Sequence, residues 1–311
     1  MLTVLKTALE VGLIYGLVAL ALFISFSILN IADLSTDGCF TLGCAVGAML
    51  TIAGHPLLAL PAAMAAGVLS GFITAFLQTR LGVESILAGI ISNTGLYTIN
   101  LAVMGFSSNV SITGRATVFS LFKALTGGSQ WSTLVLLALL LGVIAVVLIR
   151  FFGTSLGLSI RATGDSLDMV SASSINPKAT ITIGLCLANA LTALSGCLIG
   201  EYNKFCDINL GTGMVTIALA SLIIGEVFAG RRGGIGKRVV CVVLGSIVYR
   251  LIIALALRLN ISAEYFKLVS AVIVAVAIAA PNMKDYVHLA KIRSNARKLR
   301  ALSGKGDATD A

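Results

Sequence analysis

Long apolar runs separated by short polar interruptions make up most of this 311-residue chain. Most of the runs approach the roughly 20 apolar residues that an α-helix needs to cross a bilayer. The pattern therefore predicts an all-α, polytopic membrane helix bundle of about nine spans, forming one domain over residues 1–283 and followed by a basic tail over residues 284–311. The predicted spans are residues 6–28, 38–54, 57–78, 85–105, 132–152, 179–200, 212–229, 237–258 and 265–282.

The composition places this bundle in a membrane. Only 11% of the residues are charged, whereas a soluble domain has about 25%. The 32 glycines suit helices that pack closely in lipid. The cysteines show neither a C-x-x-C pair nor the spacing of a zinc site, so we interpret them as small packing residues and predict no metal or other cofactor. They are Cys39, Cys44, Cys186, Cys197, Cys206 and Cys241.

The net charge of +9 does not indicate nucleic-acid binding, because the basic residues gather at the ends of the predicted spans and in the tail. If residues 153–178 face the cytoplasm, that side carries fifteen Lys and Arg residues and the opposite side carries six. The positive-inside rule then predicts a cytoplasmic C-terminus, and nine spans put the N-terminus outside. The first span lacks a clear cleavage-site pattern and is predicted to be retained.

The polar segment from Gly153 to Pro177 separates two apolar runs and carries charges that cannot lie in hydrocarbon. Its centre predicts one short helix. Gly164 and Asp165 open this helix, and it ends before Pro177, since proline disfavours helix in the residue that precedes it. A short polar helix between two spans suits docking to a soluble partner. The alternative is a solvated loop.

A second polar interruption, from Asn30 to Asp37, divides the first long apolar region. It is either an ordinary cytoplasmic turn or a broken segment that faces a central cavity, where irregular backbone is tolerated. We favour the broken segment, because helix resumes at Gly38. Other polar groups inside predicted spans either line a path or form hydrogen bonds between helices, the second being the simpler interpretation. The candidate translocation-path residues are Asn30, Asp33, Ser35, Asn93, Asn189 and Arg250.

Arg250 lies inside the span predicted at 237–258, about 20 Å from its start at 1.5 Å per residue. A guanidinium at that depth needs a compensating interaction. Three are open: the side chain snorkels to the outer headgroups, it pairs with a carboxylate such as Glu201, Asp207 or Glu264, or it contacts an anionic group of a substrate.

Two connecting segments carry further patterns. Residues 118–125 predict an amphipathic helix in the interface plane or a re-entrant cover over a cavity mouth. The turn at 229–238 is glycine-rich and basic, but it lacks the G-x-x-x-x-G-K-S/T pattern of a phosphate loop, because Arg231 stands at the first glycine position and Arg238 follows the lysine. No other segment resembles a nucleotide-binding motif, so the chain is not expected to hydrolyse ATP itself.

Three motifs occur in a recognisable order. Asp33-Leu-Ser-Thr-Asp-Gly38 resembles a D-L-S-x-G turn, and residues 157–177 resemble an R-A-x-G-x-N helix that ends in G-I-D or G-I-N. Residues 210–220 with 229–236 resemble a G-T-G, I-A and G-G-x-G-x-x-G block. Over about residues 5–285 the chain resembles permease subunits of ABC importers of the branched-chain amino acid and ribose type. Asp165 and Ser174 depart from that pattern. With these departures the chain resembles a divergent branch of the family that is paired with binding lipoproteins for aromatic or other amino acids.

This resemblance implies the pore-forming, non-enzymatic subunit of an ATP-driven importer in the bacterial inner (cell) membrane, with an amino acid as the expected small polar solute. It implies two permease copies as a homodimer, two cytoplasmic ATPase subunits that hydrolyse ATP, and an extracytoplasmic substrate-binding protein. The segment at 158–176 is then the helix that couples ATPase motion to transport. Its expected coupling residues are Arg161, Ala162, Gly164, Asp165, Asp168 and Met169.

Other functions stay open on the sequence. A secondary transporter driven by an ion gradient needs intramembrane carboxylates, for which Glu10, Asp33 and Glu226 are candidates near span ends. An ABC importer of a sugar or a nucleoside shares the same architecture. A membrane scaffold or a membrane enzyme is the third class, but His55 and His288 are the two histidines and no Ser-His-Asp set is evident.

Overall fold

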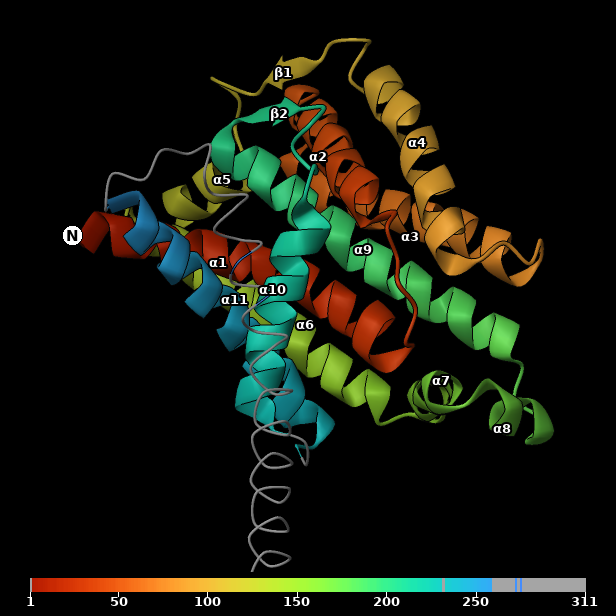
Figure 1. The fold of residues 1–311 in the computed structure, drawn as a ribbon. Helices are drawn as coiled ribbons and strands as arrows, with labels where there is room; N and C mark the ends of the chain where they lie inside the picture. Colours follow the sequence, from red (N-terminus) through yellow and green to blue (C-terminus); the bar gives the residue numbers. More distant parts are fainter. Residues whose placement is uncertain (1, 231–232, 259–271, 273–274, 276–311) are drawn as a thin grey trace, which may run out of the picture.

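The computed structural model describes residues 2–230, 233–258, 272 and 275. These residues form a bundle of helices with one two-stranded sheet (Figure 1). In chain order the elements are α1 (Leu2–Leu22), the π-helix η1 (Phe23–Ile28), α2 (Thr36–Ile52), α3 (Pro56–Thr79), α4 (Ser85–Val103), β1 (Asn109–Ser111), α5 (Val118–Leu125), α6 (Ser132–Phe152), α7 (Ser155–Asp165), α8 (Leu167–Ala172), α9 (Pro177–Asn203), β2 (Phe205–Asp207), α10 (Met214–Ala229) and α11 (Ile235–Arg258).

The all-α membrane bundle is confirmed. Six described helical segments are long and apolar enough to cross a membrane: α1 continued by η1, and α3, α4, α6, α9 and α11. Two shorter apolar helices, α2 and α10, fall where two further spans are predicted. The span predicted at 265–282 and the tail at 284–311 lie outside the described residues.

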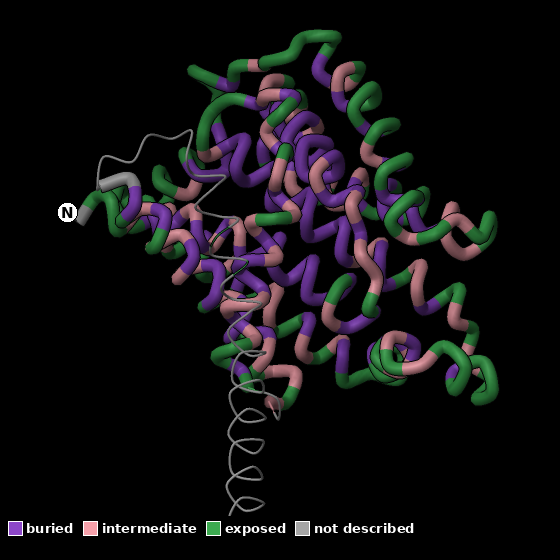
Figure 2. The backbone as a smooth tube through the Cα atoms, viewed as in Figure 1, coloured by how far each residue is buried: buried purple, intermediate pink, exposed green. Residues whose placement is uncertain are grey.

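Helix α9 lies at the centre of the bundle and is the most deeply buried of the six long helical segments (Figure 2). Glycines allow this burial, since α9 meets α2 backbone to backbone. A Cβ atom at Gly43 would overlap the carbonyl oxygen of Ala193, and one at Gly196 would overlap the carbonyl oxygen of Phe40. Such small residues let helices approach closely in lipid, where van der Waals contact drives association.

The interruption between η1 and α2 begins at the exposed Asn30 and reaches the interior of the bundle at Asp33 and Ser35. Asn30 has a left-handed backbone with φ of 55°, and helix resumes at Thr36. Asp33 accepts a hydrogen bond from Asn189, which is twelve residues into α9 and therefore about 18 Å along it. A break at that depth is stable only where protein groups satisfy its backbone.

The polar segment at 153–178 forms two short helices, α7 and α8, so the prediction of one helix opened by Gly164 and Asp165 is wrong. These two residues form the last turn of α7. Thr154 caps α7 by accepting from the backbone N–H of Gly157 at 3.3 Å. Ser166 is extended, ends α7 and caps α8 by accepting from the N–H of Met169 at 3.3 Å. Both cap residues were visible in the sequence, and Ser and Thr are preferred at the N-cap of a helix.

The opposite end of the bundle carries α5 and the small sheet (Figure 1). The helix predicted at 118–125 is confirmed, while the antiparallel pairing of β1 with β2, with Val110 opposite Cys206, was not predicted. The Glu201 carboxylate at the end of α9 accepts from the backbone N–H of Val118 at 2.8 Å and from the Thr51 hydroxyl at 3.0 Å. Helix α5 is thereby fastened to both α9 and α2.

Candidate functional site

A buried polar cluster joins the broken segment to α9. The Asp33 carboxylate accepts from the Ser35 backbone N–H at 2.9 Å and from the Ser35 hydroxyl at 2.6 Å. Its other oxygen accepts from the Asn189 amide at 2.8 Å. The exposed fractions of Asp33, Ser35 and Asn189 are 3%, 0% and 1%. Three donors around one carboxylate compensate for its removal from water.

The other predicted path residues lie around this cluster or apart from it. Asn93 on α4 is half-buried, and its side-chain oxygen would lie 2.6 Å from a Cβ atom at Gly38, so it borders the start of α2. Asn30 is exposed. Arg250 lies elsewhere, between α1 and α11. The structure therefore brings Asp33, Ser35 and Asn189 together, with Asn93 close by, and their role in transport stays a prediction.

Asp37 joins the two shorter apolar helices, α2 and α10. This role was not predicted from the sequence. Asp37 lies in the first turn of α2, and its carboxylate accepts from the N–H groups of Gly213 and Val215, both at 3.0 Å, at the start of α10. Thr41 also accepts from the N–H of Gly211 at 3.1 Å. The N-termini of α2 and α10 thus meet at one carboxylate, which suits the positive ends of both helix dipoles. The Gly-Thr-Gly motif at 211–213 was the available signal.

We expect Asp37→Ala to lower the free energy of unfolding by about 1–2 kcal/mol, the usual cost of losing a helix cap. Asp37→Asn should lose less, because its amide oxygen can still accept one of the two hydrogen bonds. Thermal unfolding of the purified chain measures both. Glu84→Ala is the matched control, since Glu84 precedes α4 but its side chain caps nothing. Equal effects at positions 37 and 84 would contradict the joining role.

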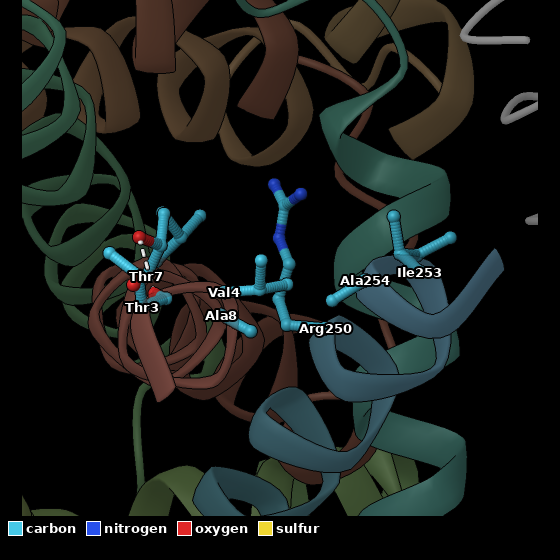
Figure 3. A pocket seen from close by; sticks show the side chains of 8 residues that line it. Thr3, Val4, Thr7, Ala8, Arg250, Ile253 and Ala254 are labelled. Atoms are coloured by element: carbon cyan, nitrogen blue, oxygen red, sulfur yellow. Dashed lines mark hydrogen bonds between the residues drawn. The ribbon is translucent and has the colours of Figure 1, made fainter. Parts of the chain in front are cut away.

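Arg250 is enclosed between α1 and α11. Its guanidinium carbon lies 3.9 Å from the ring centroid of Tyr15, and its buried Nε has no hydrogen-bond partner within the described part of the chain. Figure 3 shows the side chain extending beside Val4 and Ala8 of α1 and Ile253 of α11, along a pocket of about 290 Å³. A cation on an aromatic face gains about 2 kcal/mol or more when desolvated.

The carboxylates considered as partners of Arg250 are engaged elsewhere or not described. Both oxygens of Glu201 accept hydrogen bonds from Thr51 and Val118. Asp207 accepts from the backbone N–H of Asn209 at 2.8 Å. Glu264 lies outside the described residues. Among the described groups, the Tyr15 ring is therefore the observed compensation for the guanidinium.

Helix α7 is seated on the end of η1. A Cβ atom at Gly164 would overlap the carbonyl oxygen of Ile28, and Ile160 is fully buried. The hydroxyls of Thr163 and Thr180 lie 2.8 Å apart and tie α7 to α9. One face of α7 therefore rests on the chain immediately before the broken segment.

The predicted coupling residues divide between two faces. Gly164 of α7 contacts the backbone of η1, and Ala162 of the same helix is half-buried. The charged side chains and Met169 are exposed and free to meet a partner. The exposed residues are Arg161, Asp165, Asp168 and Met169.

A second polar cluster links η1 to the turn between α10 and α11. The Ser27 hydroxyl donates to the Glu226 carboxylate. Arg238 donates to Glu226 at 2.7 Å and to Ser27 at 2.6 Å, and its guanidinium lies 5.0 Å from the ring centroid of Phe23. Both ends of η1 are thus held by neighbouring elements, Phe23 and Ser27 by this cluster and Ile28 by α7.

No cluster of three or more His, Cys, Asp or Glu residues suited to a metal ion occurs within residues 2–230 and 233–258 or at 272 and 275. The six cysteines are free thiols, five of them buried. This placement agrees with their interpretation as packing residues.

Known proteins similar to this chain now identify its family. The family model described as branched-chain amino acid transport system, permease component, matches residues 4–278. A protein named tyrosine transport system permease protein, from Clostridioides difficile (strain R20291), is 32% identical over 273 residues, which cover 88% of this chain and 89% of that protein. An uncharacterized protein of Rickettsia prowazekii (strain Madrid E) is 31% identical over 285 residues, covering 91% of this chain and 99% of that protein. No solved structure matches the chain significantly.

The matched residues include the broken segment, both polar clusters and α7 and α8. They include α1 from its third residue onward and every later helix up to α11, so the likeness extends over the described bundle. The chain is a multi-pass membrane protein and belongs to the permease family of branched-chain amino acid transport systems of the ABC type.

Proposed function

We propose that this permease forms the membrane pathway of an ATP-driven importer and that α7 and α8 receive the motion of a cytoplasmic ATPase subunit. The observation that carries the proposal is the seat of Gly164 against the backbone at Ile28. A push on the exposed face of α7 is transmitted through this backbone contact to the end of η1. From there it reaches the break and the Asp33–Asn189 hydrogen bond, since packed elements shift as rigid bodies rather than deform.

The proposed substrate is an amino acid, with tyrosine as the first candidate. The relative of 32% identity is named as a tyrosine transport system permease, and the departures at Asp165 and Ser174 resemble a branch that serves aromatic or other amino acids. The assembly we propose has two copies of this chain, two ATPase subunits and an extracytoplasmic binding protein. It places α7, α8 and the C-terminus in the cytoplasm and the N-terminus outside the inner membrane.

Transport driven by an ion gradient is the alternative, and its three candidate carboxylates all have partners. Glu226 pairs with Arg238 at 2.7 Å. One oxygen of Glu10 accepts from the Tyr202 hydroxyl at 2.9 Å, and the other, which has no hydrogen-bond partner among the described residues, lies 3.7 Å from the Lys6 ammonium. Asp33 accepts three hydrogen bonds. Carboxylates held in this way are poor candidates for a coupling-ion site, which favours the ATP-driven mechanism.

The proposal is tested by reconstitution. The permease is co-expressed with an ATPase subunit and a binding protein of its own transport system and placed in proteoliposomes, with ATP on the side of α7. We expect uptake of labelled tyrosine that needs both ATP and the binding protein, with ribose as the comparison solute. Uptake that follows an ion gradient without ATP would overturn the mechanism. ATP-driven uptake of ribose alone would overturn only the substrate.

Arg250 offers a prediction within this function. If its guanidinium meets the carboxylate of the substrate, Arg250→Gln should assemble normally but lower uptake about tenfold or more, because a hydrogen bond to a charged group contributes about 1.5–3 kcal/mol. Uptake by Arg250→Lys should lie between that of the wild type and that of Arg250→Gln. Uptake by the reconstituted complex and the yield of folded permease measure this. Tyr15→Leu is the control that removes the stacking ring but keeps the charge. Unchanged uptake by Arg250→Leu would rule out a substrate contact.

A further inference from the structure

A cleft of about 610 Å³ opens between the end of α3 and the start of α9. Its walls include Phe72 and Phe76 from α3 and Ile183 from α9, and its rim carries Arg80 and Lys178. Arg80 directly follows α3, and Lys178 lies in the first turn of α9. The rim is therefore at the same end of the bundle as α7 and α8.

The packing of α3 on α9 explains why the two helices separate here. In the middle of the bundle they touch through glycines: a Cβ atom at Gly67 would overlap the carbonyl oxygen of Asn189, and one at Gly71 would lie 2.6 Å from the carbonyl oxygen of Leu185. The next turns of α3 carry large rings instead. Phe72 and Phe76, with ring centroids 6.4 Å apart, line the cleft, which lies on the C-terminal side of the two glycines of α3.

The cleft lining has an apolar part and a basic part. The apolar part is exposed, with 51% of Phe72, 45% of Phe76 and 37% of Ile183 accessible. Its rim has two cations, and neither Arg80 nor Lys178 lies within 4 Å of a carboxylate of the described residues. Two unpaired like charges beside an apolar wall give a site that favours an amphipathic anion.

We propose that this cleft binds an anionic phospholipid, with its phosphate between Arg80 and Lys178 and its acyl chains along Phe72, Phe76 and Ile183. Basic pockets between membrane helices are suited to anionic headgroups, and each basic residue near such a surface contributes about a fivefold gain in affinity. A free phosphate would contact only the two cations and would leave the apolar part of the lining without a ligand. The orientation proposed above assigns the lipid to the cytoplasmic leaflet.

The position of the cleft links the lipid to the coupling segment. Asn176, which lines the cleft, caps α9 by accepting from the N–H of Lys178 at 3.0 Å, and it follows α8 by only a few residues. A headgroup on Lys178 therefore contacts the connection between α8 and α9. Bound lipid holds this connection in place while the ATPase subunit moves α8.

The test compares two lipids with the same acyl chains. Purified permease in detergent is titrated with dioleoylphosphatidylglycerol or with dioleoylphosphatidylcholine, and bound lipid is counted by native mass spectrometry. We expect tighter binding of phosphatidylglycerol to the wild type. The double variant Arg80→Gln/Lys178→Gln should bind phosphatidylglycerol about 25-fold more weakly, at roughly fivefold for each lost charge.

Two controls keep the result decisive. Arg115→Gln/Lys123→Gln removes two exposed charges from the other end of the bundle and should leave the affinity unchanged. Arg80→Lys/Lys178→Arg keeps the charges and should retain binding, so it distinguishes lost affinity from lost folding.

Three results would overturn the proposal. Equal affinity for the two lipids would remove the charge recognition. Competition by millimolar inorganic phosphate would assign the rim to a soluble anion. A double variant that loses its dimer but keeps its lipid would show that a second copy covers this face.

Discussion

Gly164→Ala should uncouple ATP hydrolysis from uptake while leaving the membrane bundle folded. The new Cβ atom would overlap the carbonyl oxygen of Ile28 and lie 3.0 Å from the Cα atom of Leu29. Both are backbone atoms, which cannot rotate away, so α7 must leave its seat. Overpacking of this kind costs about 1–3 kcal/mol, and here the cost falls on one contact between α7 and η1. We expect uptake to fall at least about tenfold.

A second variant separates the seat of α7 from its partner surface. Arg161 is exposed on α7, so Arg161→Glu should abolish co-purification of the ATPase subunit without moving α7. Gly164→Ala should keep the ATPase bound and lose its coupling. Gly142→Ala is the matched control in α6, because a Cβ atom there meets nothing within 4 Å. Normal uptake by Gly164→Ala, or by Arg161→Glu with the ATPase still bound, would contradict the proposal that α7 couples the ATPase subunit to transport.

The hydrophobic pattern predicted the helices well because lipid imposes a simple rule: a spanning segment must be long, apolar and internally hydrogen-bonded. Eight predicted spans coincide with described helices for that reason. Amphipathic spacing likewise predicted the helix at 118–125. The prediction of one helix in the segment 153–178 was wrong, because it took Gly164 and Asp165 as the helix start and overlooked the cap residues Thr154 and Ser166.

The sequence did not reveal which polar groups meet. Asp37 contacts the N–H groups of Gly213 and Val215 across more than 170 positions of chain, and no spacing rule connects residues so far apart. The π-helix η1 was missed for a related reason. Its composition is that of an ordinary apolar helix, and the contacts that Ser27 makes with α10 and α11 join residues far apart in the chain. The sequence identified the polar residues inside the predicted spans, but which groups they contact could be read only from the fold.

The hydrogen bond between Asp33 and Asn189 should show as a coupling in a double-mutant cycle. Asp33→Asn turns an amide N–H₂ toward the Asn189 amide, which already donates to the Leu185 carbonyl at 3.2 Å, so two buried donors face each other. Asn189→Asp brings two carboxylates together. Each single variant should lose about 1–3 kcal/mol of stability. The exchanged pair restores one donor facing one acceptor, and we expect it to recover at least about 1 kcal/mol of the summed loss.

Thermal unfolding of the four proteins gives the coupling energy, and uptake by the same four separates two roles for the pair. Asp33→Asn combined with Asn93→Asp is the matched control, because it returns a carboxylate to the bundle at a half-buried position that Asp33 does not contact. Losses that simply add would show that the two residues act independently. If the exchanged pair regains both stability and uptake, the hydrogen bond is structural. If it regains stability alone, the negative charge is needed at position 33, where the broken segment meets the interior of the bundle, and Asp33 belongs to the translocation path.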